Sequence, residues 1–147
     1  MRLALEEARA AAAQGEVPVG CVIVCNGEVL ARAHNRRETD GDATAHAETM
    51  AIREACRKKG SWRLSDCALF VTLEPCLMCA GAIYNARVGM LVYGLRDPAA
   101  GAVGGVLNVF QENFSFSPRI YGGVLAQESE RLLQDFFAAV RKNKMSD

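Results

Sequence analysis

The sequence lacks any long hydrophobic run. No stretch approaches the ~20 apolar residues of a membrane-spanning helix. The N-terminal stretch MRLALEEARAAAAQGE is alanine-rich, but Glu6, Glu7 and Arg9 interrupt it. A signal peptide needs an uninterrupted apolar core, so this stretch does not match one. The sequence therefore predicts a cytoplasmic protein without membrane association.

The sequence also has no excess of charge of either sign. Its 17 lysines and arginines balance 17 aspartates and glutamates, which gives a formal net charge of +0. No global field draws such a protein to nucleic acid, so a nucleic-acid site must depend on a local basic patch. Zero net charge also favours self-association.

Internal repeats and domain boundaries are absent as well. With 147 residues, of which 50% are hydrophobic and only four are proline, the chain fits one globular domain over residues 1–147. A chain of this length buries about two-thirds of its unfolded surface without needing disulfides. Its six cysteines are therefore interpreted as reduced intracellular thiols, available for packing or metal binding.

Hydrophobic patterning predicts helices that alternate with strands. Asn26-Gly27 is a strong hairpin signal because both central residues of the turn need positive φ. We expect antiparallel strands at 17–25 and 28–33 and further strands at 68–73 and 89–95. Helices are expected at 2–14, 45–58, 75–86 and 127–142. A loop is expected at 35–44, in which Asp42 or Thr44 caps the next helix, and irregular structure at 108–119. This order predicts a mixed sheet with helices on both faces.

Cys76 and Cys79 lie three residues apart at the expected start of a helix, in LEPCLMCAGA. Two thiols at a helix N-terminus suit a redox dithiol, because the positive end of the helix dipole lowers thiol pKa values. They also suit half of a structural zinc site, or two ligands of a catalytic metal. The three interpretations predict different partners elsewhere in the chain.

A second cysteine pair with chelating spacing is missing. Cys21 and Cys25 lie four residues apart on one expected strand, too far apart to bind one ion easily. Cys56 and Cys67 have no partner spacing either. We interpret all four as packing residues, since free cysteine behaves as a small hydrophobe.

His46 supplies a third ligand candidate, at the expected start of another helix in the sequence HAE. His46, Cys76 and Cys79 leave the fourth tetrahedral position open, which is typical of a catalytic zinc and not of a structural one. Glu48 adds the free carboxylate that a hydrolytic reaction needs. The pattern H-x-E followed by P-C-x-x-C is the known signature of zinc-dependent nucleobase deaminases.

Beyond this motif, the sequence resembles the bacterial tRNA-specific adenosine deaminases of the cytidine deaminase superfamily. The matching stretches are EVPVGCVIV (16–24), HNR (34–36), DATAHAE (42–48), VTLEPCLMCAGAI (71–83), YGLRDPAAGAVGG (93–105) and GVLAQESERLLQDFF (123–137). The resemblance implies a three-layer α/β/α cytidine deaminase-like fold, with a central mixed sheet of about five strands flanked by helices. It further implies conversion of adenosine to inosine at the tRNA wobble position, one Zn²⁺ per subunit, the tRNA anticodon arm as partner, and a homodimer.

The same resemblance assigns roles to individual residues. Glu48 matches the proton shuttle, and His46, Cys76 and Cys79 match the zinc ligands. The substrate-binding residues that it implies are Asn35 and the backbone of Ala47 on the flipped base, Val17, Pro18 and Leu73 as apolar walls, and Asp97 and Arg36 on the RNA backbone.

Three stretches depart from the family pattern, namely Pro98–Ala100, Gly105 and residues 117–119. All three lie on the expected RNA-facing side, and a short N-terminal extension found in relatives is expected to be missing. The alternative function is deamination of a free nucleobase or nucleotide, of guanine or cytosine type, on the same zinc site. A non-catalytic partner subunit is disfavoured, because a structural metal has no use for Glu48.

Overall fold

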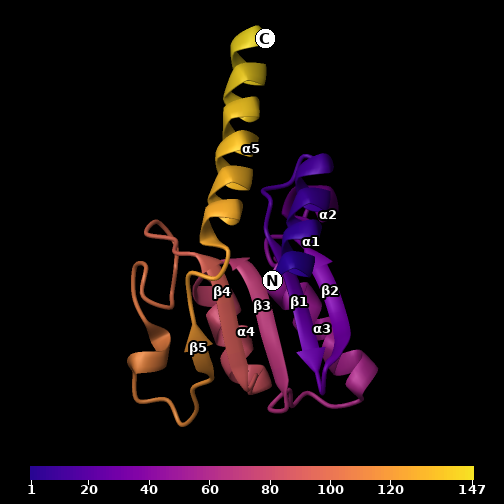
Figure 1. The fold of residues 1–147 in the computed structure, drawn as a ribbon, viewed down its shortest axis with the longest axis vertical. Coiled ribbons are helices and arrows are strands. Elements are labelled where there is room, and N and C mark those ends of the chain that lie inside the picture. The colour runs from indigo at the N-terminus through magenta and orange to yellow at the C-terminus, as the bar shows by residue number, and fades with distance from the viewer.

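The computed structural model describes all 147 residues and contains one five-stranded sheet in the order β2-β1-β3-β4-β5 (Figure 1). The strands are β1 (Gly20–Cys25), β2 (Glu28–His34), β3 (Cys67–Leu73), β4 (Met90–Leu95) and β5 (Arg119–Tyr121). β1 runs antiparallel to β2 and β3, whereas β3, β4 and β5 are parallel to one another. The predicted mixed sheet is confirmed.

Helices cover both faces of this sheet, as the sequence predicted. They are α1 (Arg2–Ala13), α2 (Arg37–Asp40), α3 (Ala47–Lys59), α4 (Leu77–Ala86) and α5 (Ala126–Ser146), with a 3₁₀ turn η1 (Val109–Gln111). α3 and α4 pack together on one face, and α1 and α5 contact each other on the opposite face. Figure 1 shows α5 extending past the sheet, with its C-terminal end away from the body. None of the helices combines the length and the apolar character that crossing a membrane requires.

The main core lies between the sheet and the pair α3 and α4. Alternate strand positions point to this side, because successive side chains of a strand face opposite ways, and Ile23, Leu69 and Leu91 are buried there. The facing helices contribute small residues such as Ala51 and Ala80, which let the helix backbones approach the sheet closely. Each fully buried Leu or Ile stabilises the fold by about 1.5–3 kcal/mol.

On the other face, α1 lies directly against β1. A Cβ atom at Gly20 would come within 1.9 Å of the carbonyl oxygen of Ala4. Only glycine therefore permits this approach, and Ala4 and Ala8 are fully buried by it. The contact positions residues 16–19, which connect α1 to β1 and border the cavity described below.

Several element boundaries differ from the predictions. β1 begins at Gly20 and not at Val17, because Pro18 has no N–H to donate and the Val19 N–H donates to the Val17 carbonyl instead. The N-cap position of α3 is His46 and not Asp42 or Thr44, and its side chain makes no capping hydrogen bond. The stretch 108–119, expected to be irregular, contains η1 and leads into β5, a three-residue strand too short to be recognised from periodicity.

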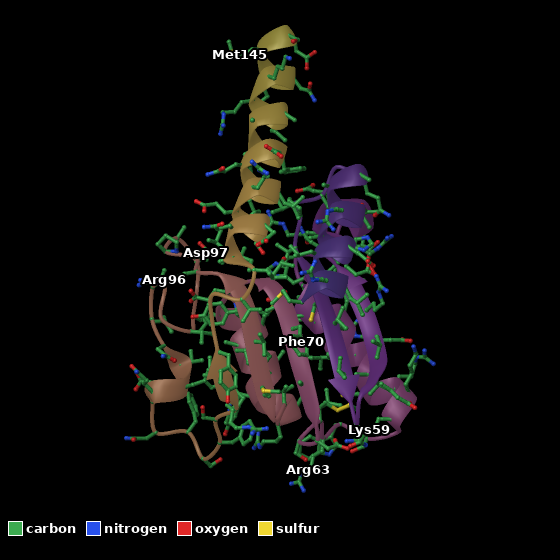
Figure 2. All side chains as sticks on the ribbon, viewed as in Figure 1. Lys59, Arg63, Phe70, Arg96, Asp97 and Met145 are labelled. Carbon is green, nitrogen blue, oxygen red and sulfur yellow. A yellow bond between two sulfur atoms is a disulfide. The ribbon has the colours of Figure 1, made fainter.

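The interpretation of Cys25 and Cys67 as free packing residues is wrong. They are directly paired across β1 and β3 and form a disulfide, with Cα atoms 4.3 Å apart. Figure 2 shows the disulfide at the end of the sheet near Lys59, far from Asp97. Strand register brings together two cysteines that are 42 residues apart, so short sequence spacing could not predict the pair. Cys21 is buried and free, as predicted.

Candidate active site

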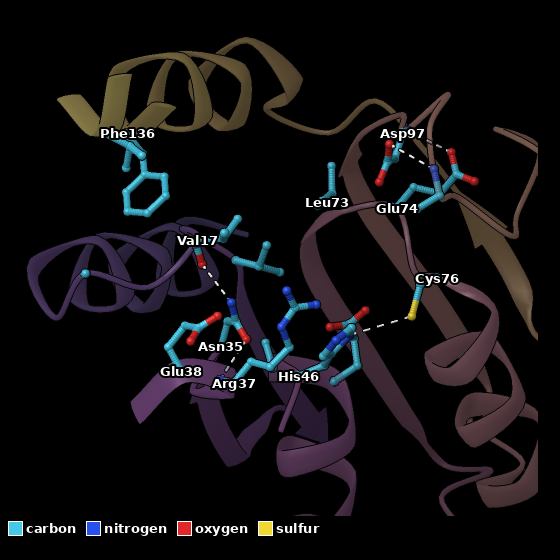
Figure 3. A pocket seen from close by; sticks show the side chains of 16 residues that line it. Val17, Asn35, Arg37, Glu38, His46, Leu73, Glu74, Cys76, Asp97 and Phe136 are labelled. Carbon is cyan, nitrogen blue, oxygen red and sulfur yellow. Dashed lines mark hydrogen bonds between the residues drawn. The ribbon is translucent and has the colours of Figure 1, made fainter. Parts of the chain in front are cut away.

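A cavity of about 400 Å³ opens where the N-terminal ends of α3 and α4 meet the C-terminal end of β3 (Figure 3). The loop after β4 and one side of α5 complete its wall. Its lining includes these predicted site residues: Val17, Asn35, His46, Ala47, Glu48, Leu73, Cys76 and Asp97. Most of the residues predicted from sequence therefore meet in one place.

The three predicted metal ligands converge at the floor of this cavity. His46 Nδ1 lies 3.6 Å from the Sγ atom of Cys76 and 3.6 Å from that of Cys79. Tetrahedral zinc, with bonds of about 2.3 Å to sulfur and about 2.0 Å to nitrogen, would hold such atoms about 3.5 Å apart. The three groups thus fit a zinc ion. The other histidine, His34, instead faces Glu7 and Gln14.

Helix starts create this convergence. His46 is the N-cap of α3 and Cys76 the N-cap of α4, and neither N-cap side chain bonds its own helix. Both side chains therefore remain free to face each other across the gap between the helices. The partial positive charge at each helix N-terminus also favours thiolate over thiol.

Cys76 and Cys79 affect each other's thiol pKa values. A hydrogen bond from the Cys79 thiol, helped by His46, lowers the pKa of Cys76 to about 4. The same hydrogen bond, together with burial, raises the pKa of Cys79. Metal ligands must be deprotonated, so a divalent cation bound here would hold both sulfurs as thiolates.

Glu48 lies in the first turn of α3 and is only 4% exposed. Burial raises the pKa of its carboxyl group from 4.5 to about 7. A carboxyl group with this pKa both accepts and donates protons near neutral pH. Glu48 borders the cavity beside His46 and Cys76 and is suited to proton transfer there.

Asn35 belongs to the opposite side of the cavity. Its Nδ2 donates to the carbonyl of Val17 at 3.4 Å, and its Oδ1 accepts from the backbone N–H of Arg37 at 3.2 Å. Figure 3 shows Asn35 with Val17 and Arg37 across the cavity from Cys76. These bonds hold the amide in one orientation at the wall.

Three predicted site residues do not line the cavity. Cys79 is completely buried and reaches only the metal-binding position. Pro18 is fully buried and is not part of the cavity lining. The guanidinium of Arg36 pairs with Asp40 at 3.0 Å, and the neighbouring Arg37 lines the cavity instead.

The structure also adds lining residues that the sequence reasoning missed, among them Arg37, Glu38, Glu74, Ala100, Phe136 and Val140. Phe136 and Val140 lie on the helix expected at 127–142, for which the sequence indicated no role in the site. Their spacing of four residues predicted a shared face but not what that face covers. Glu74 had a signal, since it is a carboxylate in an otherwise apolar, buried stretch.

The fold and the site together define a class, the zinc-dependent deaminases. The family model described as the cytidine and deoxycytidylate deaminase zinc-binding region matches residues 1–95. Two relatives named tRNA-specific adenosine deaminase are similar over nearly the whole chain. The protein of Bacillus subtilis (strain 168) is 48% identical over 98% of this chain and 90% of its own. That of Agrobacterium fabrum (strain C58) is 46% identical over 100% of this chain and 95% of its own.

Solved structures of similar chains support the same class. A chain from studies of A-to-I editing by tRNA:A34 deaminases superposes with a TM-score of 0.86 at 48% identity, covering 90% of this chain and 97% of that one. Guanine deaminase from Nitrosomonas europaea superposes with a TM-score of 0.78 at 26% identity, covering 92% and 81%. The chain belongs to the cytidine and deoxycytidylate deaminase family and, within it, to the tRNA-specific adenosine deaminases.

Proposed function

We propose that this protein hydrolytically deaminates adenosine to inosine at the wobble position of the tRNA anticodon. The observation that carries the proposal is the buried Glu48 beside three candidate metal ligands, which would leave the fourth position of a tetrahedral zinc open. Relatives named tRNA-specific adenosine deaminase, similar over nearly the full chain, support the substrate.

The residues at the cavity floor supply the chemistry. Zinc held by His46, Cys76 and Cys79 would act as a Lewis acid that makes water nucleophilic near neutral pH. The Glu48 carboxylate accepts a proton from the attacking water. It delivers this proton to the purine ring nitrogen, then takes the second proton from the oxygen now bonded to the ring carbon and delivers it to the amino group. Oxygen replaces nitrogen on the ring carbon, and ammonia leaves.

The cavity walls suit a flipped base. Val17 and Leu73 offer apolar contacts, with Pro18 behind them, while the Asn35 amide and the Ala47 backbone provide polar ones. We assign Asp97 at the mouth, and Arg36 outside it, to the RNA backbone. Extruding the base into such a pocket exposes the reacting carbon, which is inaccessible in a stacked strand.

We further propose that residues 1–147 form one catalytic domain with one Zn²⁺ per subunit, which acts in the cytoplasm on the tRNA anticodon arm as a homodimer. An exposed apolar patch formed by Leu77, Val106 and Leu107 supports the dimer. The backbone N–H groups of Val106 and Leu107 both donate to the carbonyl of Gly101, and Gly101 forms an isolated β-bridge with Cys76. The patch therefore adjoins the site. A single monomeric species in sedimentation would contradict this proposal.

The substrate is tested with purified protein and an anticodon stem-loop that carries adenosine at the wobble position. We expect inosine and ammonia to form, and Glu48→Gln to lower the rate by about 10²–10⁴-fold because the proton shuttle is lost. A stem-loop with guanosine at that position controls for specificity. Absence of inosine with the wild-type protein would reject the proposal.

Deamination of a free base is the second candidate, favoured by the likeness to guanine deaminase from Nitrosomonas europaea. Free adenine, guanine and cytosine are therefore incubated in parallel, and ammonia is measured. Turnover of guanine or cytosine, with none of the stem-loop, would select this alternative.

The zinc assignment is tested with the chain's two histidines. We expect His46→Ala to lower the zinc content of the purified protein at least about tenfold, because a direct ligand is lost. His34→Ala is the matched control and should keep zinc, since His34 contacts Glu7 and Gln14. Zinc is measured by elemental analysis of folded protein, and equal zinc in both variants would contradict the assignment.

A further inference from the structure

Two buried carboxylates flank the cavity without taking part in the chemistry described above. Glu16 is 1% exposed and Glu74 is 2% exposed. Neither forms an ion pair with a lysine, arginine or histidine. Both instead accept hydrogen bonds from backbone N–H groups of segments distant in sequence, which are α2 for Glu16 and the loop after β4 for Glu74. Burial of an ionised group is costly unless it is fully bonded, and these hydrogen bonds offset that cost.

Glu74 accepts hydrogen bonds from several backbone N–H groups of the loop that follows β4. Its Oε1 accepts from the Asp97 N–H at 3.1 Å, and its Oε2 accepts from the N–H groups of Val103 and Gly105, each at 2.9 Å. Glu74 lies two residues before the ligand Cys76 in the chain. One carboxylate therefore ties the loop that carries Asp97 to the segment that carries a metal ligand.

The loop leaves no free space around this carboxylate. A Cβ atom at Gly101 would lie 2.1 Å from Glu74 Oε2, and one at Gly105 would lie 2.0 Å from the carbonyl oxygen of Asp97. The Asp97 side chain in turn accepts from the N–H groups of Ala99 and Ala100. The position of Asp97 thus follows from the bonds made by Glu74.

Glu16 does the same on the other side of the cavity. Its Oε1 accepts from the N–H groups of Glu38 at 2.8 Å and Thr39 at 3.0 Å, at the start of α2. The next residue, Val17, provides the carbonyl that orients Asn35. Figure 3 shows Glu38 and Asn35 on one side of the cavity, and Asp97 with Glu74 on the other.

We propose that Glu16 and Glu74 are positioning residues that set the two sides of the substrate cavity, Glu16 through the Asn35–Thr39 segment and Glu74 through the loop 97–105. Bonds from N–H groups to an ionised carboxylate are stronger than bonds between neutral groups. They hold each loop at its place before substrate arrives, which is the preorganisation that oriented catalysis needs. The substrate part of this proposal rests on the proposed function.

Amide hydrogen exchange tests the positioning without any assay of activity. In Glu74→Gln the side-chain NH₂ replaces one acceptor, so at least one backbone N–H loses its partner. We expect exchange at Asp97, Val103 or Gly105 to become at least about tenfold faster, while Glu38 and Thr39 stay unchanged. Glu16→Gln should give the opposite pattern. The exposed Glu112→Gln should change neither loop. Unchanged exchange in both loops, or equal acceleration throughout each variant, would overturn the proposal.

Kinetics on the wobble-adenosine stem-loop separate positioning from general support of the fold. We expect Glu74→Gln to raise KM about tenfold and to lower kcat less than about threefold. In an Asp97→Ala background the further effect on KM should shrink to less than about twofold, because both changes act on the same contact. If the effects of Glu74→Gln and Asp97→Ala on KM were additive, Glu74 would not act by positioning Asp97. Inactivity of the wild-type protein would instead reject the proposed function, and the exchange pattern would still decide the positioning role.

Discussion

At the scale of single residues, the proposed chemistry depends on four side chains at two helix starts. His46, Cys76 and Cys79 were predicted as ligands from their types and spacing, and the structure brings their donor atoms within 4.8 Å of one another. Glu48 was predicted as the free carboxylate beside them. Its burial, and hence its raised pKa, was not predictable, because burial depends on the elements packed around α3.

The raised pKa of Glu48 leads to a test by pH and stability in the metal-free protein. Its pKa is about 7 in the folded state, compared with an ordinary value of 4.5. The folded state thus binds the proton more tightly, and the stability this contributes is complete below pH 4.5 and is lost as the pH rises through 7. The loss amounts to about 3 kcal/mol of unfolding free energy.

Glutamine at this position cannot ionise. We therefore expect metal-free Glu48→Gln to be more stable than the metal-free wild type by about 3 kcal/mol at pH 8, with the difference vanishing near pH 4. Urea unfolding at both pH values measures it, and Glu112→Gln, which changes an exposed glutamate without an ion pair, is the control. A difference independent of pH would contradict a buried, protonated Glu48.

At the scale of elements, the sequence predicted most helices and strands, and the errors share a cause. The hairpin at Asn26-Gly27 is local, and both residues adopt positive φ as predicted. β5 exists only because it pairs with β4, and the disulfide exists only because β1 and β3 share a register. Pairing between distant segments leaves no periodic pattern in either one.

The Cys25–Cys67 disulfide closes a loop with a sequence separation of 42 residues that contains His46 and Glu48. A cross-link of this span stabilises the protein by about 4 kcal/mol in the chain-entropy model. We expect the double variant Cys25→Ala/Cys67→Ala to lose about this much unfolding free energy relative to the oxidised wild type.

Deamination should persist in this double variant, because Cys25 and Cys67 lie at the ends of β1 and β3 that are remote from the cavity. Denaturant unfolding and the stem-loop assay provide the two measurements. Cys56→Ala, which removes a free cysteine, is the control. A double variant that is as stable as the oxidised wild type would show that the cross-link adds nothing.

At the scale of the whole molecule, the net charge is balanced, but lysine and arginine side chains without an ion pair are unevenly distributed. Arg57 and Lys58 pair with Glu54, and Lys59 pairs with Asp66. The cluster near the end of α5, formed by Arg141, Lys142 and Lys144, has no ion pair. It lies on the helix whose Phe136 borders the cavity. We therefore expect this cluster to be the local basic patch that contacts the RNA backbone.

Salt dependence of RNA binding tests this cluster. We expect the triple alanine variant at Arg141, Lys142 and Lys144 to bind the stem-loop more weakly. The slope of log affinity against log salt should decrease in magnitude by about 2, because three phosphate contacts are lost. The matched control replaces Arg57, Lys58 and Lys59, whose charges are already paired, and should change the slope little. Equal slopes in the two variants would contradict the role of α5.

The sequence by itself predicted the metal ligands and the acid–base residue, and it determined the hairpin and the mixed α/β architecture, because residue type and short spacing are local properties. Tertiary structure decided which distant segments meet. It joined His46 to a cysteine pair 30 residues away, paired Cys25 with Cys67, and brought Phe136 to the cavity. It also buried Glu16 and Glu74 where distant backbone N–H groups converge. Those contacts depend on register and packing, which arise only once the chain has folded.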